Sequence, residues 1–334
     1  MNLLVTGAAG FIGSNFVGEA LKKGHQVVGL DAFTYAGHKE NLEEYKEGFH
    51  LVEGNICDQQ LVESLLNEFQ IDGVINFAAE SHVDRSIEGP GVFIQTNIVG
   101  VYNLLDCGLK YWKHKKDFRM VQVSTDEVYG SLGDSGYFTE NTPYKPNSPY
   151  SASKASGDFL ARAWFKTYQF PVITTNCSNN YGPKQYPEKL IPHMIQCALK
   201  EKPLPVYGTG KNVRDWIHVS DHCQGVLLAL EKGLPGETYC FGGRSERNNI
   251  TVVKEICTLL DELSPRRNGK KYEELIQFVE DRKGHDWRYA IDDTKAQKEL
   301  GFERQFQNFE EGLKNTVQWY LDHQNWVQKV LGEQ

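Results

Sequence analysis

The sequence has no long apolar run and no closely spaced pair of cysteines. No apolar stretch approaches the roughly 20 residues that a helix needs to span a bilayer, so we expect no membrane segment. The seven cysteines are odd in number and scattered, which is typical of a reducing compartment. The first predicted strand starts at position 3 and leaves no room for a signal peptide. We therefore expect a cytoplasmic protein.

Basic residues are in the minority, with 36 lysines and arginines against 44 aspartates and glutamates and a formal net charge of −8. A nucleic-acid surface needs a basic stripe, so we expect no nucleic-acid partner. A metal site is not predicted either. His218 and His222 lie near Asp221 and Cys223, but a strand is predicted to end and a helix to begin around them, so the two histidines need not share a face.

The start of the chain has the pattern of a dinucleotide-binding loop. A short apolar strand at residues 3–6 runs into Gly7, Gly10 and Gly13 and then into a helical pattern. Glycines at this spacing permit a tight turn and a close approach of the backbone to a pyrophosphate. A second apolar strand ends in Asp31, where an acid would bind ribose hydroxyls and repel the extra phosphate of NADP. NAD is therefore the predicted cofactor; the alternative is that Asp31 only ends a strand or caps a turn.

The first half of the chain alternates predicted strands with helical patterns. The strands are expected near 2–6, 26–31, 73–77, 119–124 and 171–175. This alternation predicts an α/β fold with a doubly wound, Rossmann-type parallel sheet. Prolines then break up the chain before helices predicted near 220–232, 251–263 and 308–322. We expect residues 1–180, together with about 211–243, to form the NAD-binding domain, and 181–210 with 244–334 to form a smaller, mixed α/β substrate lobe.

Two further motifs indicate chemistry. Tyr150 and Lys154 begin a long helical pattern, so the phenol and the ammonium project from one face. A nearby cation lowers the pKa of a phenol, which makes Tyr150 a candidate base, although such a pair also occurs by chance on helices. Asp126 and Glu127 follow the strand at 119–124, and ligands of open α/β sheets bind beyond the carboxyl ends of strands. The alternative for this acidic pair is a solvated loop or a helix cap.

The chain resembles the extended short-chain dehydrogenase/reductases and, within them, the dTDP-glucose 4,6-dehydratases over nearly its whole length. The resemblance rests on TGAAGFIGS at 6–14, DAFTYAG at 31–37, AAESHVDRS at 78–86, STDEVYG at 124–130, YSASK at 150–154, NCSNNYGP at 176–183, KLIP at 189–192, VRDW at 213–216 and DRKGHD at 281–286. It implies a lyase that uses bound NAD to convert dTDP-glucose to the 4-keto-6-deoxy sugar, as in deoxysugar biosynthesis such as that of dTDP-rhamnose.

The resemblance also implies a role for each catalytic residue. Tyr150, with Thr125 holding the same hydroxyl, takes the proton of the carbon 4 alcohol. Glu127 takes the carbon 5 proton and Asp126 protonates the departing carbon 6 hydroxyl. Lys154 binds the nicotinamide ribose.

Two further sets of residues are carried over from the family. The implied cofactor residues are Gly7, Gly10, Phe11, Ile12, Gly13, Asp31, Ala32, Phe33, Thr34, Asn55, Ile56, Phe77, Ala78, Ala79, Ser81, Thr96, Tyr150, Lys154 and Asn180. The implied substrate residues are Ser81, Thr125, Asn179, Lys189, Leu190, Pro205, Tyr207, Arg214, Asn249, Arg282 and His285. At position 55 the family usually has aspartate; asparagine keeps hydrogen-bonding capacity toward the adenine.

The helical runs near 92–112 and 148–169 carry apolar residues on more than one side. The resemblance implies that these helices form a four-helix bundle between the subunits of a homodimer. Two alternative functions remain open at this point. One is a UDP-sugar 4,6-dehydratase or 4-epimerase, although related epimerases lack the acidic pair at Asp126 and Glu127. The other is a non-catalytic NAD-sensing protein, because a fold alone implies no function.

Overall fold

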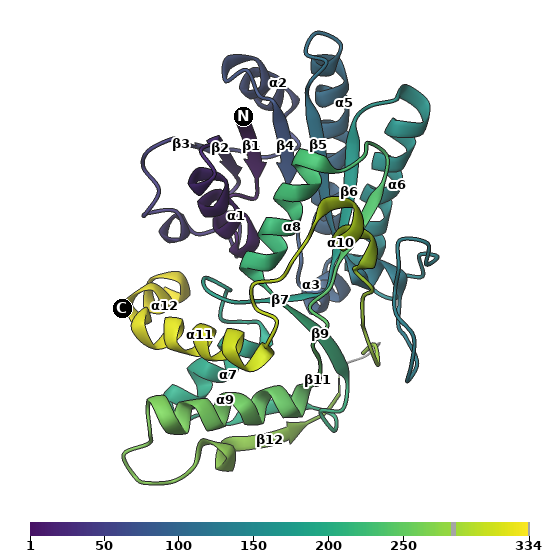
Figure 1. Cartoon of the computed structure of the whole chain (residues 1–334). Coiled ribbons are helices and arrows are strands. Elements are labelled where there is room, and N and C mark those ends of the chain that lie inside the picture. Colours follow the sequence, from purple (N-terminus) through teal and green to yellow (C-terminus); the bar gives the residue numbers. More distant parts are fainter. Residues whose placement is uncertain (282–284, 333–334) are drawn as a thin grey trace.

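The centre of the molecule is a parallel sheet in the order β10-β6-β5-β4-β1-β2-β3 (Figure 1). The computed structural model describes residues 1–281 and 285–332. The strands of the sheet are β1 Asn2–Thr6, β2 Gln26–Asp31, β3 Phe49–Glu53, β4 Gly73–Asn76, β5 Arg119–Thr125, β6 Val172–Cys177 and β10 Thr238–Phe241. The order reverses between β1 and β4, which is where open α/β sheets bind ligands.

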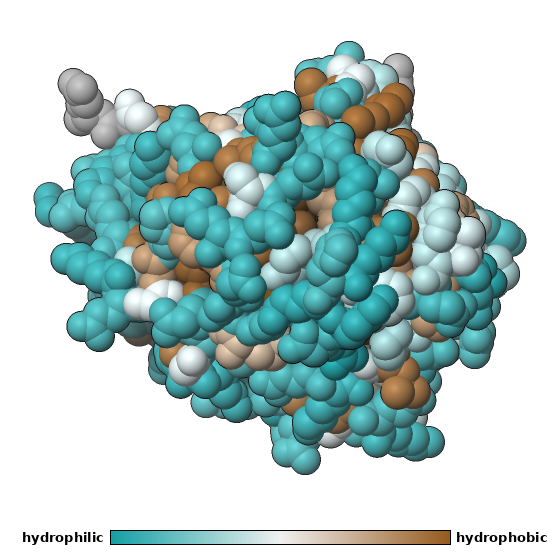
Figure 2. All heavy atoms as spheres, turned by 90° about the horizontal axis from the view of Figure 1, so that it is seen from above, coloured by the Kyte–Doolittle hydropathy of each residue, from teal (hydrophilic) through white to brown (hydrophobic). Residues whose placement is uncertain are grey.

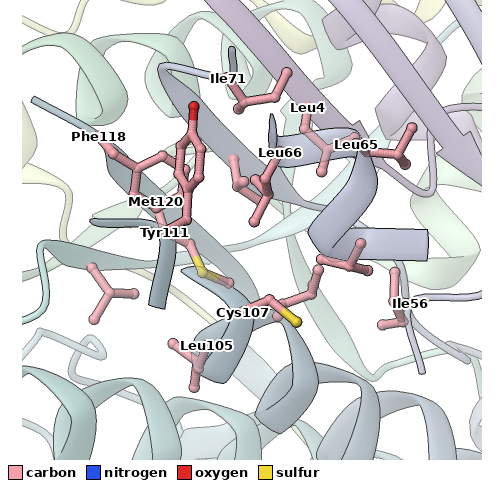
Figure 3. Close-up of a cluster of buried hydrophobic side chains, with 14 of the residues drawn as sticks. Leu4, Ile56, Leu65, Leu66, Ile71, Leu105, Cys107, Tyr111, Phe118 and Met120 are labelled. Atoms are coloured by element: carbon pink, nitrogen blue, oxygen red, sulfur yellow. The ribbon is translucent and has the colours of Figure 1, made fainter. Parts of the chain in front are cut away.

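Helices cover both faces of this sheet. The helices of one face are α1 Phe11–Lys22 and α8 Val219–Lys232, and those of the other are α2 Gln59–Glu68, α5 Val101–Trp112 and α6 Pro149–Tyr168. Successive side chains of a strand point to opposite faces, so Leu3 and Val5 of β1 pack in the first core and Leu4 in the second. Figure 3 shows Leu4 in this second core with Leu65 of α2 and Leu105 of α5. Strands buried on both faces explain the continuous apolar runs of the sequence.

The remaining elements lie mostly in the lower half of Figure 1. The helical ones are η1 Lys39–Asn41, α3 Val83–Glu88, α4 Gly91–Ile94, a π-helical turn η2 at Gln95–Gly100, a 3-10 turn η3 at Asp126–Tyr129, α7 Leu190–Leu199, α9 Asn249–Leu263, η4 Tyr272–Leu275, α10 Thr294–Leu300, α11 Phe309–Asp322 and α12 Gln324–Leu331. Two small sheets accompany them, β11-β9-β7 and β12-β8, built from β7 Asn179–Tyr181, β8 Leu204–Tyr207, β9 Val213–His218, β11 Glu246–Asn248 and β12 Ile276–Val279.

A separate hydrophobic core lies below the large sheet. Helices α7, α9 and α11 contribute Ile191, Val252 and Leu313 to it, and Tyr181 of β7 and Trp216 of β9 pack with them. Because this core shares none of its residues with the two cores that flank the large sheet, the second half of the chain has its own apolar centre.

The predicted fold class is confirmed. The expected strands near 2–6, 26–31, 73–77, 119–124 and 171–175 correspond to β1, β2, β4, β5 and β6, and the helices expected in the second half correspond to α8, α9 and α11. Strands β3 and β10 at the two edges of the sheet were not predicted. The alternating partial exposure of β3 and the short length of β10 weaken the sequence signal of both strands.

In the described part of the chain, no helix combines the length and the apolar character that crossing a membrane requires. The face seen from above in Figure 2, on the side of the sheet away from the lower half, is mainly hydrophilic with separate hydrophobic patches.

Replacement of Gly243 tests the close packing of the large sheet's edge against β9. A Cβ atom there would lie 1.7 Å from the backbone oxygen of Trp216, so backbone would have to move. We expect Gly243→Ala to lower the free energy of unfolding by about 3 kcal/mol, measured by urea denaturation. At Gly133 nothing lies within 4 Å of the added atom, so Gly133→Ala is the control, and equal effects of the two substitutions would contradict the prediction.

Candidate active site

A cavity of about 330 Å³ opens at the carboxyl ends of the central strands. Its wall includes Gly7 after β1, Asp31 at the end of β2, Ala78 after β4, Thr125 at the end of β5 and Tyr150 on α6. The cavity therefore lies at the reversal of strand order, where parallel sheets bind ligands. This location matches the site that the sequence motifs predicted.

The glycines of the first loop allow close packing of the backbone around the start of α1. Gly7 has φ +66, and a Cβ atom on it would lie 2.7 Å from the backbone nitrogen of Ala78. A Cβ on Gly13 would lie 2.1 Å from the Gly7 oxygen. Gly10 caps the start of α1 without any side-chain hydrogen bond, so the first N–H groups of this helix are not covered by a capping side chain. A pyrophosphate fits this arrangement of glycines and helix start.

Asp31 gives the cavity an acid at the end of β2. Its Oδ2 accepts a hydrogen bond of 2.8 Å from the Ala9 nitrogen, and its Oδ1 accepts one of 2.8 Å from the Phe33 nitrogen. Burial raises the pKa of Asp31, and these backbone hydrogen bonds oppose the rise. The carboxylate is thus held in one orientation with lone pairs left for ribose hydroxyls, while a phosphate there would meet like charge.

The predicted catalytic residues meet at the end of β5. Thr125 caps the 3-10 turn η3 by accepting a hydrogen bond of 3.3 Å from the Glu127 nitrogen, and its hydroxyl also hydrogen bonds to Tyr150. Tyr150 lies in the first turn of α6, which begins with a capping box at Ser148. Lys154, one turn further along α6, donates a hydrogen bond of 2.7 Å to the Val123 oxygen.

The surroundings of Asp126 favour its un-ionised form. The residue is only 2% exposed, and its Oδ2 has no hydrogen-bond partner within the described part of the chain. Burial raises its pKa well above the ordinary value, and the negative charges of Glu127 and Asp215 add to this, while the Arg214 charge opposes it. A buried carboxyl with a raised pKa can donate a proton at neutral pH.

Lys154 was expected to lower the pKa of Tyr150, but in the protein chain itself the pKa of Tyr150 is raised. Burial raises the pKa of Tyr150 well above its ordinary value, and the charge of Glu127 raises it further. Burial also lowers the pKa of Lys154, whose ammonium donates to the Val123 oxygen and is stabilised by the charge of Asp158. The prediction that Lys154 lowers the pKa of the phenol is not supported by the chain itself, in which the net shift of Tyr150 is upward and burial is its largest cause.

Most of the predicted cofactor residues line this one cavity. They are Gly7, Gly10, Phe11, Ile12, Gly13, Asp31, Ala32, Thr34, Asn55, Ile56, Phe77, Ala78, Ala79, Ser81, Thr96, Tyr150, Lys154 and Asn180. Phe33 is outside the lining and packs against the core formed with α1 and α8. Its positive φ of 48 turns the chain after Asp31.

The predicted substrate residues fall into two groups. Ser81, Thr125, Asn179 and Lys189 line the cavity, and Leu190, Pro205, Tyr207, Arg214, Asn249 and His285 are not in its wall. Arg214 is buried, stacks 4.3 Å from the centre of the Tyr289 ring and donates to the Asp286 oxygen at 3.0 Å. Tyr207 and His285 meet edge to face with ring centres 6.4 Å apart. Arg282 lies outside the described residues.

The cavity wall also contains residues that the sequence analysis did not assign. They are Tyr35, Glu80, Gln185, Tyr186 and Glu188, among others. Arg85 connects two of them, with its guanidinium 3.8 Å from the centre of the Tyr35 ring and 3.7 Å from Glu188 Oε2. Tyr35 and Glu80 lie inside motifs that the sequence analysis used, so their place in these motifs was a signal that could have identified them. Residues 185–188 follow Pro183 in a loop without any periodic signal.

His218 and His222 take structural positions. The His218 ring accepts a hydrogen bond from the Ser220 nitrogen at the start of α8, and the His222 ring lies 2.9 Å from Asn180 Oδ1. Burial lowers the pKa of His218 to about 4 and that of His222 to about 3, so both rings are neutral. Among the described residues, no group of three histidine, cysteine or carboxylate side chains is placed to hold a metal ion.

A dinucleotide loop that shares one cavity with Tyr150 and Lys154 defines a short-chain dehydrogenase/reductase. The family model described as GDP-mannose 4,6 dehydratase matches residues 4–316. A dTDP-glucose 4,6-dehydratase of Xanthomonas campestris is 59% identical over 98% of this chain and 95% of its own length. The chain therefore belongs to the GDP-mannose 4,6 dehydratase family and, within it, to the dTDP-glucose 4,6-dehydratases.

Solved structures agree with this assignment. A dTDP-glucose 4,6-dehydratase of Streptomyces venezuelae, with NAD and TYD bound, has a TM-score of 0.90 and 44% identity over 99% of this chain and 100% of that chain. A UDP-glucose 4-epimerase of Thermotoga maritima with UDP-glucose has a TM-score of 0.86 and 28% identity over 96% and 99%. The fold is thus shared by enzymes with different reactions, and the side chains of the site distinguish them.

The raised pKa of Asp126 predicts a pH-dependent stability. The folded protein holds a proton that the unfolded chain releases above its own pKa of about 4, so the free energy of unfolding falls as pH rises through the interval between the two pKa values. Asp126→Asn removes this titration. We expect the difference in free energy of unfolding between Asp126→Asn and the wild type to grow, by at most about 1.4 kcal/mol per pH unit, as the pH rises above about 5.

Urea denaturation at a series of pH values measures this difference. The control is Asp117→Asn, at a side chain that is 77% exposed, for which the difference should stay flat. A difference for Asp126→Asn that does not change with pH would contradict the prediction.

Proposed function

We propose that the protein dehydrates dTDP-glucose to dTDP-4-keto-6-deoxyglucose with NAD bound in the cavity. The observation that carries this proposal is the pairing of Asp126, a buried carboxyl with a raised pKa, with Glu127 next to Tyr150 in one cavity wall. The reaction needs a base at carbon 4, a base at carbon 5 and an acid at the carbon 6 hydroxyl. These three groups are Tyr150, Glu127 and Asp126. The product serves deoxysugar biosynthesis, of which dTDP-rhamnose formation is one example.

The residues that would hold NAD are the glycine loop, Asp31 and Lys154. The loop around Gly7 and Gly10 would bind the pyrophosphate, Asp31 would bind ribose hydroxyls, and the Lys154 ammonium would bind the second ribose. When bound, NAD supplies an acceptor and later a donor of hydride, and its oxidised ring is a cation that favours an ionised phenol nearby.

The side chains at the end of β5 move the protons. The Tyr150 oxygen takes the proton of the carbon 4 hydroxyl, which Thr125 orients. The ketone then acidifies carbon 5, where Glu127 takes the proton. Asp126 gives its proton to the carbon 6 oxygen, which leaves as water, and Glu127 returns its proton to carbon 5. The low exposure of Thr125, Asp126 and Tyr150 keeps bulk water from competing for their protons.

A UDP-sugar enzyme is the second candidate function, because an epimerase has the same fold. Epimerisation at carbon 4 needs no acid at carbon 6. It therefore does not explain why the pKa of Asp126 is raised. A non-catalytic NAD sensor needs none of the three proton-transferring groups. The buried acid therefore favours a dehydratase over an epimerase and over a sensor.

The proposed function also suggests how the two parts of the chain divide the binding of NAD and sugar nucleotide. We propose that residues 1–180 with about 211–243 bind NAD, that 181–210 with 244–334 bind the sugar nucleotide, and that Leu190, Pro205, Tyr207, Arg214, Asn249, Arg282 and His285 contact the nucleotide sugar. The seven cysteines of the sequence and the absence of disulfides among the described residues support a cytoplasmic location.

Separate incubations with dTDP-glucose, UDP-glucose and UDP-N-acetylglucosamine test the function. We expect the loss of one water from dTDP-glucose alone, followed by mass and by the alkaline absorbance of the 4-keto-6-deoxy product. Asp126→Asn and Glu127→Gln should each lower kcat by about 100-fold or more, because each removes one proton-transferring group. Asp117→Asn, at an exposed site away from the cavity, is the matched control. Epimerisation without water loss, or NAD binding without turnover, would contradict the proposal.

We also propose a homodimer formed through α5 and α6, supported by exposed apolar side chains there. Phe159 on α6 is 57% exposed, and Val99 and Tyr102 on η2 and α5 are exposed as well. We expect light scattering at micromolar concentration to give the mass of two chains for the wild type and of one chain for Phe159→Glu. Leu234→Glu changes an exposed leucine of the loop after α8 and should leave the dimer intact. A monomeric wild type would contradict this interface.

A further inference from the structure

The proposed dehydration leaves two groups of the site in the wrong protonation state. Tyr150 gains the proton of the carbon 4 hydroxyl, and because the product keeps its ketone, that proton is never returned to the sugar. Asp126 loses its proton to the departing water. Glu127 takes a proton from carbon 5 and gives it back there, so its state is unchanged. After one turnover Tyr150 therefore holds one proton too many and Asp126 one too few.

The overall reaction neither consumes nor releases a proton. One sugar nucleotide gives one keto sugar nucleotide and one water, and the hydride moves from carbon 4 to carbon 6. The only reset that the enzyme needs is the transfer of one proton from Tyr150 to Asp126. This transfer requires a path between the Tyr150 and Asp126 oxygens.

The Thr125 hydroxyl lies on that path. Its Oγ1 donates a hydrogen bond to Asp126 Oδ1 over 3.3 Å and also hydrogen bonds to the Tyr150 hydroxyl. A third contact, of 3.3 Å from the Glu127 nitrogen, fixes the position of Oγ1. A threonine hydroxyl has one proton and two lone pairs, so it can accept from Tyr150 and from the backbone while it donates to Asp126.

We propose that Thr125 is a proton relay that resets the site after each turnover. The Tyr150 O–H gives its proton to Thr125 Oγ1 as the Thr125 O–H gives its own to the Asp126 carboxylate. One O–H bond breaks and one forms at each step, and the charge moves from Asp126 to Tyr150. Afterwards Asp126 donates to Thr125 and Thr125 donates to Tyr150. The same two hydrogen bonds persist with their directions reversed, and the backbone contact from Glu127 is unchanged.

The burial of the three side chains favours this internal path over one through bulk water. Thr125 is 9% exposed, Tyr150 8% and Asp126 2%. Within the described residues the second oxygen of Asp126 has no hydrogen-bond partner, so the Thr125 hydroxyl is the polar contact of this carboxyl that leads toward Tyr150. Burial and neighbouring acids raise the pKa of Asp126, which favours the arrival of the proton on its carboxylate.

A relay differs from a residue that only orients the substrate. The relay proposal rests on the proposed function. A substrate-orienting hydroxyl affects the first turnover and every later turnover equally. A relay affects only the turnovers after the first, because the enzyme starts with Tyr150 and Asp126 correctly protonated. The two roles are therefore separated by comparing the first turnover with the steady state of the same variant.

Thr125→Val removes the hydroxyl at nearly constant shape, and Thr125→Ser keeps it. We expect rapid quenching of the NAD-loaded enzyme with excess dTDP-glucose to show, for Thr125→Val, a burst of one product per site and then a steady state about tenfold or more slower. For the wild type and Thr125→Ser the ratio of the two rates should stay near unity. Thr125→Ala, a second variant without the hydroxyl, replaces Thr125→Val if that protein does not fold.

Added small buffers provide the second readout. A blocked relay leaves exchange with solvent as the only reset, so the steady-state rate of Thr125→Val should rise with the concentration of imidazole, and that of Thr125→Ser should not. Equal slowing of first and later turnovers, or a burst that is shared by all variants and insensitive to buffer, would overturn the relay. If the wild type loses no water even in the first turnover, the proposed function itself is wrong and the relay falls with it.

Discussion

The chemistry of this site depends on the removal of charged groups from water at the end of β5. Burial is the largest cause of the pKa shifts of Asp126, Tyr150, Lys154 and Asp158. Each group is shifted toward its neutral form, which is the direction that desolvation always favours. The protons of the site are consequently shared among a few fixed partners rather than with solvent, and each hydrogen bond determines where a proton can go.

One strand and one helix supply nearly all of these partners. Residues 123–125 of β5 contact Lys154, Asp158 and Tyr150 of α6, through the Val123 carbonyl, a 2.6 Å hydrogen bond from Ser124 and the Thr125 hydroxyl. The three α6 residues are four positions apart, so they share one helix face. A parallel sheet that ends all its strands on one side therefore converts a short sequence at the end of β5 into a row of contacts with one helix face.

The sequence predicted the elements whose signals are local, and it missed those set by long-range packing. The strands β1, β2, β4, β5 and β6 are apolar runs with clear ends, whereas β3 and β10 become strands through their neighbours in the sheet. The site motifs were recognisable because catalysis fixes residue type and spacing. The upward pKa shift of Tyr150 in the chain was not predicted, because spacing along a helix gives the distance to Lys154 but neither the burial of both groups nor the turn of the ammonium toward Val123.

The same fold carries epimerases and dehydratases, so the difference between them must lie in a few side chains. Two adjacent carboxyls can act as acid and base only if their environments differ. Here the 3-10 turn after β5 places Asp126 against the buried Asp215 and the Thr125 hydroxyl, while Glu127 is only partly buried. Desolvation and like charge then hold the proton on Asp126. In the proposed mechanism, the acid of the reaction is thus selected by where a short turn puts two neighbouring residues, which would let one scaffold add an elimination to a simple redox cycle.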